Sequence, residues 1–467
     1  MLAQLSRVPV KLDCLKIPGV LRLEELNFTT FHLIALFIFF CAVIHTLTIH
    51  KIHRKARTME LQKPPHSQRG SGRDLVIQLL YFLSEVEIVF GIWVIPLFLA
   101  IACFYNWHIA VEYINTRDYT EALFIIVIMS LASTRPIIQL SETLLKKVAH
   151  RCLGGSLSAW WFTLLTVGPI LGSFITEVGA MSLSAVLLSR RFYQACPSKQ
   201  LSYATLGLLF VNISVGGILT NFASPAVLIL AKAWHWTSTD MFLTFGWKAV
   251  LGILLANLCY WFYFRKEFEY LDSRTVTTTP EEALLIPGWV TLTHSLFILA
   301  VVLSSHYPAI FIAVFLFFIG LHHATRVHQY SLKLARPLLV GFFLAGLIIH
   351  GGLQGWWVVR LLEDATPHFV MGSAMMLTAF NDNTAIAYLS TLLPNWSDLS
   401  KYAIFTGVIA GGGLTVIANA PNPAGFQILR RHFESGISPW GLFRAAFVPT
   451  MILYAVFYFF SDLFWGS

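Results

Sequence analysis

Ten long apolar runs constrain the fold of this chain more than any other feature. A helix needs about 20 predominantly apolar residues to cross the hydrocarbon core of a bilayer, and most of the ten runs reach that length. The sequence therefore predicts an all-α polytopic membrane protein with about ten transmembrane helices. We expect them over residues 31–50, 75–105, 121–142, 201–231, 243–264, 288–305, 307–322, 337–358, 401–429 and 443–464.

The composition supports a membrane protein and argues against other classes. Of the 467 residues, 56% are hydrophobic and 12% are charged, against about 25% charged residues in an average soluble domain. The basic residues form short clusters between apolar runs, so the lipid bilayer is the expected partner and nucleic acid is not. The six cysteines have no paired spacing, which argues against a disulfide framework or a metal site. No nucleotide motif or soluble core-forming segment occurs, so we expect neither an enzyme nor a cofactor.

The basic clusters also predict the topology. Cytoplasmic loops carry an excess of Lys and Arg, and the clusters mark alternate loops at residues 51–73, 146–151, 190–199, 265–274, 326–336 and 430–444. The first 30 residues contain four basic residues that interrupt any apolar core, so they are interpreted as a surface tail rather than a cleaved signal peptide.

Two further apolar segments are too short to cross the membrane twice. The segment 155–190 has basic clusters at both ends, so it must begin and end in the cytoplasm, yet two crossings would need more than about 40 residues. We expect a re-entrant hairpin with its tip between Gly168 and Gly179, where Gly and Pro weaken the helix. The segment 369–393 has acidic flanks and is expected to be a second re-entrant hairpin, entering from outside.

The order of these segments predicts two inverted-topology repeats. Each half has three spans, a hairpin and two spans, and an odd number of crossings forces the second copy to be inverted. The expected domains are a tail at 1–30, repeat 1 at 31–264 with hairpin 155–190 and broken helix 201–231, a cytoplasmic linker at 265–287, and repeat 2 at 288–467 with hairpin 369–393 and broken helix 401–429.

The hairpins and broken helices carry duplicated polar motifs. GSFITEVGAMSLSAVLL begins at Gly172 and LTAFNDNTAIAYLSTLL at Leu377; GGILTNFASPAV begins at Gly216 and GGGLTVIANAPNPAG at Gly411. This alignment superposes Glu177 on Asp382 and Asn221 on Asn419. Unwound backbone at membrane depth is tolerated only where it is buried in protein or lines a cavity. The predicted break residues, which give the repeats their discontinuous helices, are Gly216, Gly217, Pro225, Gly412, Gly413, Pro421 and Pro423.

The two acids are the candidate transport residues. A carboxylate at the centre of a membrane helix costs about 2.5–3.5 kcal/mol, so it is usually functional. Such a group can hold either a proton or a sodium ion, and that competition is the minimum chemistry of a cation/proton antiporter. Polar residues can also serve only as interhelical hydrogen bonds. Besides Glu177 and Asp382, the candidate ion ligands are Thr176, Thr220, Asn221, Ser224, Asn381, Asn383, Thr384, Asn419 and Asn422.

Other polar residues have weaker assignments. Glu85, Glu87 and His350 are candidate proton relays, although the two glutamates lie about 200° apart on a helix and cannot face one cavity together. The alternative for these glutamates is a structural acid held by a buried partner. Arg135 could be that partner, but its place near the end of a span favours a side chain that extends to the cytoplasmic surface. The histidines at 322, 323 and 328 are interpreted as a solvated surface.

At these motifs the sequence resembles the ion transporter superfamily, which includes D-type sodium/proton antiporters, arsenite pumps and citrate carriers. It is most similar to bacterial proteins labelled sodium/proton antiporters, through TNFASPAV at 220, FNDNTAIAYL at 380 and IANAPNPAGF at 417. The resemblance implies two hairpins facing two discontinuous helices, in a homodimer of the bacterial inner membrane. Carboxylate carriers of this superfamily have Ser-Asn-Thr at the hairpin tips, whereas both tips of this chain contain an acid.

We therefore expect a secondary transporter that exchanges sodium, or another cation, for protons, with sodium and protons as the coupling ions and no metal beyond the transported sodium. The alternative is a sodium- or proton-coupled carrier of a small anion or carboxylate.

Overall fold

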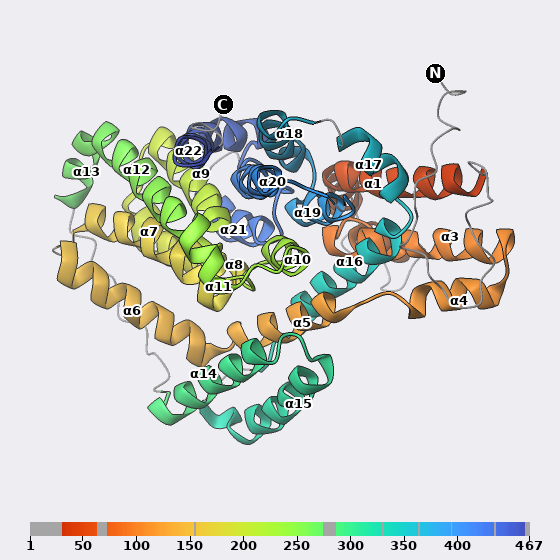
Figure 1. Ribbon diagram of the computed structural model, residues 1–467. Coiled ribbons are helices and arrows are strands. Elements are labelled where there is room, and N and C mark those ends of the chain that lie inside the picture. The colour runs from red at the N-terminus through yellow and green to blue at the C-terminus, as the bar shows by residue number, and fades with distance from the viewer. Residues whose placement is uncertain are drawn as a thin grey trace. The chain divides into compact units, whose positions relative to one another are not determined.

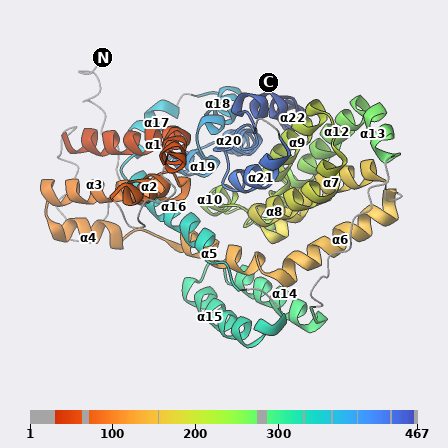
Figure 2. The same ribbon diagram turned by 180° about the vertical axis from the view of Figure 1, so that it is seen from behind.

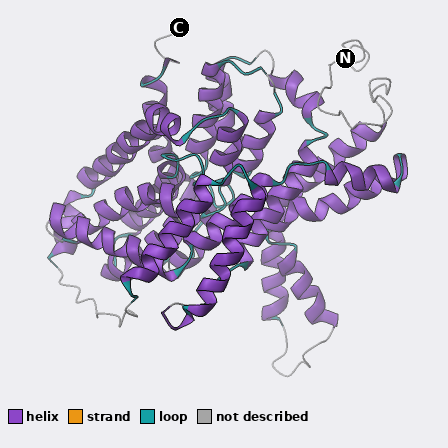
Figure 3. Cartoon of the chain, turned by 60° about the horizontal axis from the view of Figure 1, so that its bottom comes forward, coloured by secondary structure: helices purple, strands orange, loops and turns teal. Residues whose placement is uncertain are grey.

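The computed structural model describes residues 30–62, 72–153, 156–273, 286–328, 331–362, 365–393, 395–433 and 436–462, and every regular element in these ranges is helical (Figure 3). The predicted tail lies outside the described residues except for its last position, and so does residue range 274–285 of the predicted linker. The predicted all-α class is therefore correct for the described part of the chain.

The chain divides into two compact units. Unit 1 comprises residues up to Asp118 together with Ala345–Asp364. Its helices are α1 (Thr30–Leu61), α2 (Gly72–Phe82), the short turn η4 (Val86–Ile88), α3 (Val89–Phe104), α4 (Trp107–Asn115), the C-terminal part of α16 (Ala335–Gly351) and α17 (Gly355–Leu362).

Unit 2 comprises Tyr119–Leu344 and the residues from Ala365 onward. Its elements are α5 (Thr120–Ala132), α6 (Arg135–Leu153), α7 (Leu157–Ile175), α8 (Glu177–Leu187), η5 (Leu188–Phe192), η6 (Tyr193–Ala195), α9 (Lys199–Gly216), α10 (Pro225–Ala233), α11 (Ser238–Met241), η7 (Phe242–Gly246), α12 (Trp247–Tyr263), α13 (Arg265–Asp272), α14 (Gly288–Leu303), α15 (Pro308–Ala324), η8 (Arg326–His328), the start of α16, α18 (Pro367–Phe380), α19 (Asn383–Thr391), α20 (Asp398–Gly411), α21 (Asn422–Leu429), η9 (Arg430–His432) and α22 (Pro439–Phe459).

Several described helices have the length and surface of membrane spans. Four segments are long and apolar enough to cross a bilayer, and two bent helix pairs raise the number to six. On the shorter helix α14, the side chains of Leu292, Leu296, Leu299 and Leu303 are each more than half exposed on one face. A continuous apolar face of this kind indicates contact with lipid or protein rather than water.

Three of the predicted spans are interrupted rather than continuous. The run 75–105 is divided between α2 and α3, the run 121–142 bends by 64° between α5 and α6, and the run 337–358 bends by 80° between α16 and α17. Pro136 explains the second bend because it lies in the first turn of α6 and has no N–H to continue the hydrogen bonds of α5. The hydropathy of the sequence predicted the length of these apolar runs but not the bends within them.

Both segments predicted as hairpins form pairs of helices. α7 and α8 are joined by the single residue Thr176 and lie side by side (Figure 1), and α18 and α19 are joined by Asn381 and Asp382. The first turn, at Thr176, falls inside the region between Gly168 and Gly179 where the tip was predicted. Pro169 lies within α7, which continues past it to Ile175.

Both predicted broken helices are interrupted at their glycines. α9 ends at Gly216 and α10 begins at Pro225, while α20 ends at Gly411 and α21 begins at Asn422. The glycines are needed where the chain is crowded: a Cβ at Gly216 would lie 2.5 Å from the backbone of Pro169, and one at Gly413 would lie 2.4 Å from Val211.

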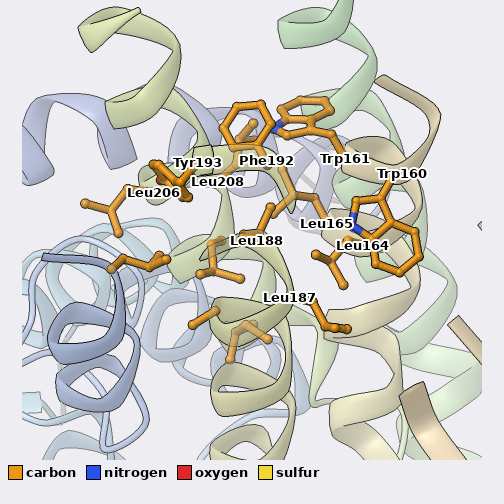
Figure 4. Packing of buried hydrophobic residues seen from close by; sticks show 14 of the residues in the cluster. Trp160, Trp161, Leu164, Leu165, Leu187, Leu188, Phe192, Tyr193, Leu206 and Leu208 are labelled. Carbon is orange, nitrogen blue, oxygen red and sulfur yellow. The ribbon is translucent and has the colours of Figure 1, made fainter. Parts of the chain in front are cut away.

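A buried hydrophobic cluster fixes the base of the first hairpin against α9. Trp161, Leu165, Leu188 and Leu208 lie within it, as Figure 4 shows. The indole N–H of Trp161 also donates to Thr205 Oγ1 at 2.8 Å. Side chains buried in this way are close-packed, so the cluster is a rigid support for the hairpin tip.

Candidate functional site

Thr176 shapes the tip of the first hairpin. Its backbone has φ 66° and ψ 153°, a strained conformation for a β-branched residue. Its hydroxyl oxygen accepts a hydrogen bond from Gly179 N at 3.4 Å and so caps α8. The turn places Glu177 at the first position of α8, where its side chain is only 1% exposed.

The first broken helix closes against this tip. The hydroxyl of Ser173 donates to Gly216 O at 2.8 Å and accepts from Leu219 N at 2.9 Å. Thr220 Oγ1 donates to Ser173 O at 2.6 Å. Glu177 N donates to the carbonyl of Ala223 at 3.3 Å. The unwound segment therefore has part of its polar backbone paired with the hairpin that precedes it.

The second hairpin and second break repeat two of these bonds. Thr415 Oγ1 donates to Ala379 O at 2.8 Å, as Thr220 does to Ser173. Asn383 N donates to Ala418 O at 2.9 Å, as Glu177 does to Ala223. In both matched bonds the hairpin residues differ by 206 in number, and the break residues differ by 195.

These matched bonds correct the alignment made from sequence. Glu177 corresponds to Asn383, the first residue of α19, and Thr176 corresponds to Asp382, the N-cap of that helix. The two acids are therefore neighbours in the repeated pattern rather than equivalent positions. Likewise the break offset pairs Asn419 with Ser224 and not with Asn221. The sequence did not reveal this one-residue shift, because matching the two acids to each other was the simplest alignment of tips that share little other sequence.

Asn419 joins the two halves of the site. Its Nδ2 donates to Glu177 Oε2 at 2.9 Å, while the adjacent Ala418 carbonyl accepts from Asn383 N. The tips of both hairpins thus contact one two-residue segment of the second break. Figure 2 shows α8, α19 and α21 converging in the same region, in agreement with Figure 1.

Asp382 lies in a second polar cluster at the α19 N-terminus. Its Oδ1 accepts from Thr384 N at 2.8 Å, and its own N–H donates to Asn381 Oδ1 at 3.0 Å. Thr384 Oγ1 donates to Asn383 Oδ1 at 3.3 Å. Asp382 is 3% exposed, and its charge acts on the carboxyl group of Glu177. Two buried acids so near each other repel when both are ionised, which favours uptake of a cation.

Three buried oxygens in this region have no hydrogen-bond partner among the described residues: Glu177 Oε1, Asn419 Oδ1 and Asn422 Oδ1. Asn422 is held by its Nδ2, which donates to Gly412 O and to Thr415 O, each at 2.8 Å. Carboxylate and amide oxygens are the ligands of hard cations. In the described residues no group of three His, Cys, Asp or Glu side chains exists that would suit a bound transition metal.

Other predicted ligands have structural partners. Asn221 turns to the loop before α11, where Nδ2 donates to Trp236 O at 3.2 Å and Oδ1 accepts from Ser238 Oγ at 2.8 Å. Ser224 caps α10 by accepting from Val227 N at 3.3 Å, with Pro225 at the first helical position, and its side chain also forms a hydrogen bond with the carboxyl group of Glu177. Asn221 is therefore not brought to the acids, although sequence made it the partner of Asn419.

Two residues that sequence reasoning missed contact the site. Ser173 bridges the first break and the hairpin, as described above. Gly217, predicted only as a helix breaker, lies against Glu177: a Cβ there would be 2.6 Å from Glu177 Cγ. The glycines that begin both broken-helix motifs could have suggested that another part of the chain lies close to the backbone there. They do not reveal which side chain makes this contact.

The candidate relay residues belong to unit 1. Glu85 is exposed between α2 and η4, Glu87 is partly buried within η4, and His350 is buried with its ring near Phe39 and Phe90. Their relay role remains a prediction.

His322 differs from expectation, whereas the role of Arg135 remains a prediction. His322 is 92% buried near the ring of His294 instead of solvated, because α14 packs on α15. Arg135 begins α6 directly after the bend that follows α5.

The fold and these contacts define a helical membrane protein with two buried acids at the tips of two helical hairpins. Residues 30–460 match the model of the family described as "Putative Na+/H+ antiporter". The chain belongs to this family of transporters, which implies a transported cation and an integral membrane location.

Comparison with solved structures finds the YdaH transporter of Alcanivorax borkumensis, whose crystal structure is described as having an unusual topology. The sequence identity is 13%, the match covers 82% of this chain and 98% of that chain, and the TM-score is 0.46. No curated protein sequence matches the chain.

Proposed function

We propose that the protein exchanges sodium ions for protons, with Glu177 and Asp382 as the groups that carry one or the other. The observation that carries this proposal is the hydrogen bond from Asn419 to Glu177, which joins a buried acid of one hairpin to the unwound segment of the opposite broken helix. An acid held in this way can lose its proton only if a cation or a fixed dipole replaces the positive charge.

Neutral oxygens around the acids would complete sodium coordination. The Oδ1 atoms of Asn419 and Asn422 are buried without hydrogen-bond partners in the described part of the chain, so binding a cation there breaks no existing bond. The N-termini of α8 and α19 also point their positive ends at the two acids and stabilise the ionised forms. Protonation and sodium binding then compete for the same carboxylates.

Two inverted repeats and ten crossings form the framework of this proposal. The matched hydrogen bonds of the two hairpins and breaks support a repeated unit, and the loop charges support its inversion. A single-cysteine variant that retains the exposed Cys196 tests the topology. We expect labelling by a membrane-impermeant thiol reagent only from the cytoplasmic side; labelling from outside contradicts the first hairpin. A homodimer in the bacterial inner membrane, as the resemblance implies, completes the proposal.

Everted membrane vesicles provide the direct test of exchange. Added sodium should collapse a respiration-generated pH gradient, and Asp382→Asn and Glu177→Gln should each abolish the collapse. Asp398→Asn is the matched control because its side chain is 98% exposed, and it should behave as the wild type. Collapse that persists unchanged in both site variants would show that these acids do not carry the ions.

A coupled carrier of a small anion is the second candidate. A cavity with a basic lining beside Thr176 favours it. Uptake of a radiolabelled anion driven by an imposed sodium gradient separates this function from simple cation exchange.

A further inference from the structure

One face of α1 in unit 1 is exposed and apolar over several turns. Side chains on opposite faces of this helix differ sharply in burial: Ala35, Ala42 and Ala56 are fully buried, and α1 packs against α2 and α3. Because Thr30–Ile49 is long and apolar enough to cross a bilayer, the exposed face is suited to contact with lipid. Its large apolar side chains follow one another at intervals of three or four residues, the spacing of one helix face: Leu33, Phe37, Phe40, Ile44 and Leu47.

The same face becomes basic where its apolar part ends. Lys51, Arg54 and Lys55 continue the spacing of three or four residues after Leu47, and all three side chains are exposed. The helix has 32 residues, so at a rise of about 1.5 Å per residue it is about 48 Å long and exceeds a hydrocarbon core of about 30 Å. Lys51 lies about 27 Å along the axis from Leu33. The change from apolar to basic side chains therefore falls near the expected edge of the hydrocarbon core.

Acids of the described chain do not neutralise these cations. Among the residues that the structure describes, no carboxylate lies within 4.0 Å of Lys51, Arg54 or Lys55. Glu60 is the one acid in the sequence of α1, and its Oε2 accepts a hydrogen bond from the hydroxyl of Tyr81. The positive charge on this face is therefore available to an anion outside the protein.

We propose that Lys51, Arg54 and Lys55 bind the headgroups of anionic phospholipids in the leaflet at this end of α1. Basic clusters directly beyond a membrane span are attracted to anionic lipid. Arg54 offers a planar pair of donors that matches a phosphate, and the two lysines add point charges. A soluble anion lacks the acyl chains that the apolar part of the same face would contact, so the combined face favours a lipid.

The position of the charges around the helix distinguishes this proposal from a purely topological role. A basic cluster that only orients a span needs no particular face. Lys51, Arg54 and Lys55 nevertheless follow the exposed apolar face, whereas Arg57 lies about 120° away from Lys51 around the axis. The inference goes beyond the proposed sodium/proton exchange and does not depend on it.

Photo-crosslinking tests the surface in the full-length protein reconstituted in phosphatidylcholine bilayers. The probe is a trace of phosphatidylglycerol with a photoreactive group near its headgroup, and peptide mass spectrometry locates the cross-links. We expect cross-links on α1 beyond Ile49 that excess unlabelled phosphatidylglycerol competes away and that added phosphatidylcholine does not. Each cation near an anionic lipid changes the association by about fivefold, so Arg54→Gln combined with Lys55→Gln should lower this yield at least tenfold.

A second Arg–Lys pair provides the matched control. Arg265→Gln combined with Lys266→Gln removes an adjacent and equally exposed pair from α13, and its cross-links on α1 should equal those of the wild type. Arg54→Lys combined with Lys55→Arg keeps both charges and should retain most of the yield. Melting temperatures of all variants in phosphatidylcholine should agree, because the substituted side chains are exposed.

Three results would overturn the proposal. The first is an unchanged yield on α1 when Arg54 and Lys55 are both replaced by Gln, and the second is an equal loss in the α13 control. The third is cross-linking of α1 to a second copy of the chain in place of lipid, which would assign the face to an interface between protomers. Since the assay measures lipid binding without ion transport, its result is independent of whether the protein exchanges sodium for protons.

Discussion

Gly217→Ala should weaken sodium binding while leaving the fold intact. The backbone at this position has φ −78° and ψ 2°, which alanine adopts without strain. A Cβ would nevertheless lie 2.6 Å from Cγ and 2.7 Å from Oε1 of Glu177. Carbon atoms in contact are about 3.5–4.0 Å apart, so the Glu177 side chain must withdraw by about 1 Å.

This displacement acts on the bond that joins the two halves of the site. Asn419 Nδ2 is now 2.9 Å from Glu177 Oε2, and a shift of about 1 Å takes the pair beyond hydrogen-bonding distance. A hydrogen bond to a charged group contributes about 1.5–3 kcal/mol. Since about 1.4 kcal/mol corresponds to a factor of ten, the apparent affinity for sodium should fall by about 10- to 150-fold.

Proteoliposomes with an internal pH-sensitive dye measure this affinity through a sodium titration of proton efflux. Gly320→Ala in α15 is the matched control, because a Cβ there meets nothing within 4 Å and alanine is the better helix former. Its sodium affinity should equal that of the wild type, and the melting temperatures of both variants should stay close to it. A wild-type sodium affinity in Gly217→Ala would refute the assignment of Glu177 as a sodium-binding group.

Two further predictions concern stability. His432, in the basic segment after α21, accepts at Nε2 from Ser189 Oγ at 2.7 Å while Arg431 donates to the same hydroxyl at 2.6 Å. Burial and the Arg431 charge lower the pKa of His432 below its ordinary value near 6.5. The folded protein therefore holds this histidine neutral more strongly than the unfolded chain does. The resulting stability is complete above pH 6.5 and is lost as the pH falls through the folded-state pKa. The melting temperature should therefore decrease from pH 7 to pH 5, and less so in His432→Gln; an equal decrease in that variant contradicts the reasoning. Separately, Asn257 accepts from Asn212 and donates to Thr166, each at 2.9 Å. Asn257→Ala should lower the free energy of unfolding by about 0.6–2 kcal/mol. We expect a lower melting temperature with unchanged sodium/proton exchange. Loss of exchange at full stability would contradict the structural role and indicate a role in transport.

The hairpins and broken helices illustrate how far sequence patterns reach. Charge bias and length predicted pairs of short helices near 155–190 and 369–393, and the described helices α7, α8, α18 and α19 fall there. Glycine and proline motifs predicted the interruptions after Gly216 and Gly411. These signals are local. A helix is interrupted where a glycine gives the backbone more freedom or where a proline lacks the N–H that would donate a helical hydrogen bond.

The sequence missed features that depend on packing. The run 121–142 was expected to be one continuous span and bends by 64° between α5 and α6, and His322 was expected at a solvated surface and is buried. Asn221 and Asn419 looked equivalent by motif, yet Asn221 bonds to the loop before α11 and Asn419 bonds to Glu177. The partner of Asn419 lies 242 positions away in the chain, so only the packing of distant helices decides which polar side chain it meets.

By itself, the sequence determined an all-helical membrane protein with two acids in short polar interruptions, because apolar length, charge bias and glycine-proline breaks are each properties of contiguous residues. Only the tertiary structure decided how those interruptions meet. Asn419 reaches Glu177, Ala418 receives the N–H of Asn383, and Gly217 lies against the acid because the hairpins are packed on the unwound segments. Such convergence depends on side-chain direction and backbone separation, and these are fixed only when the helices pack.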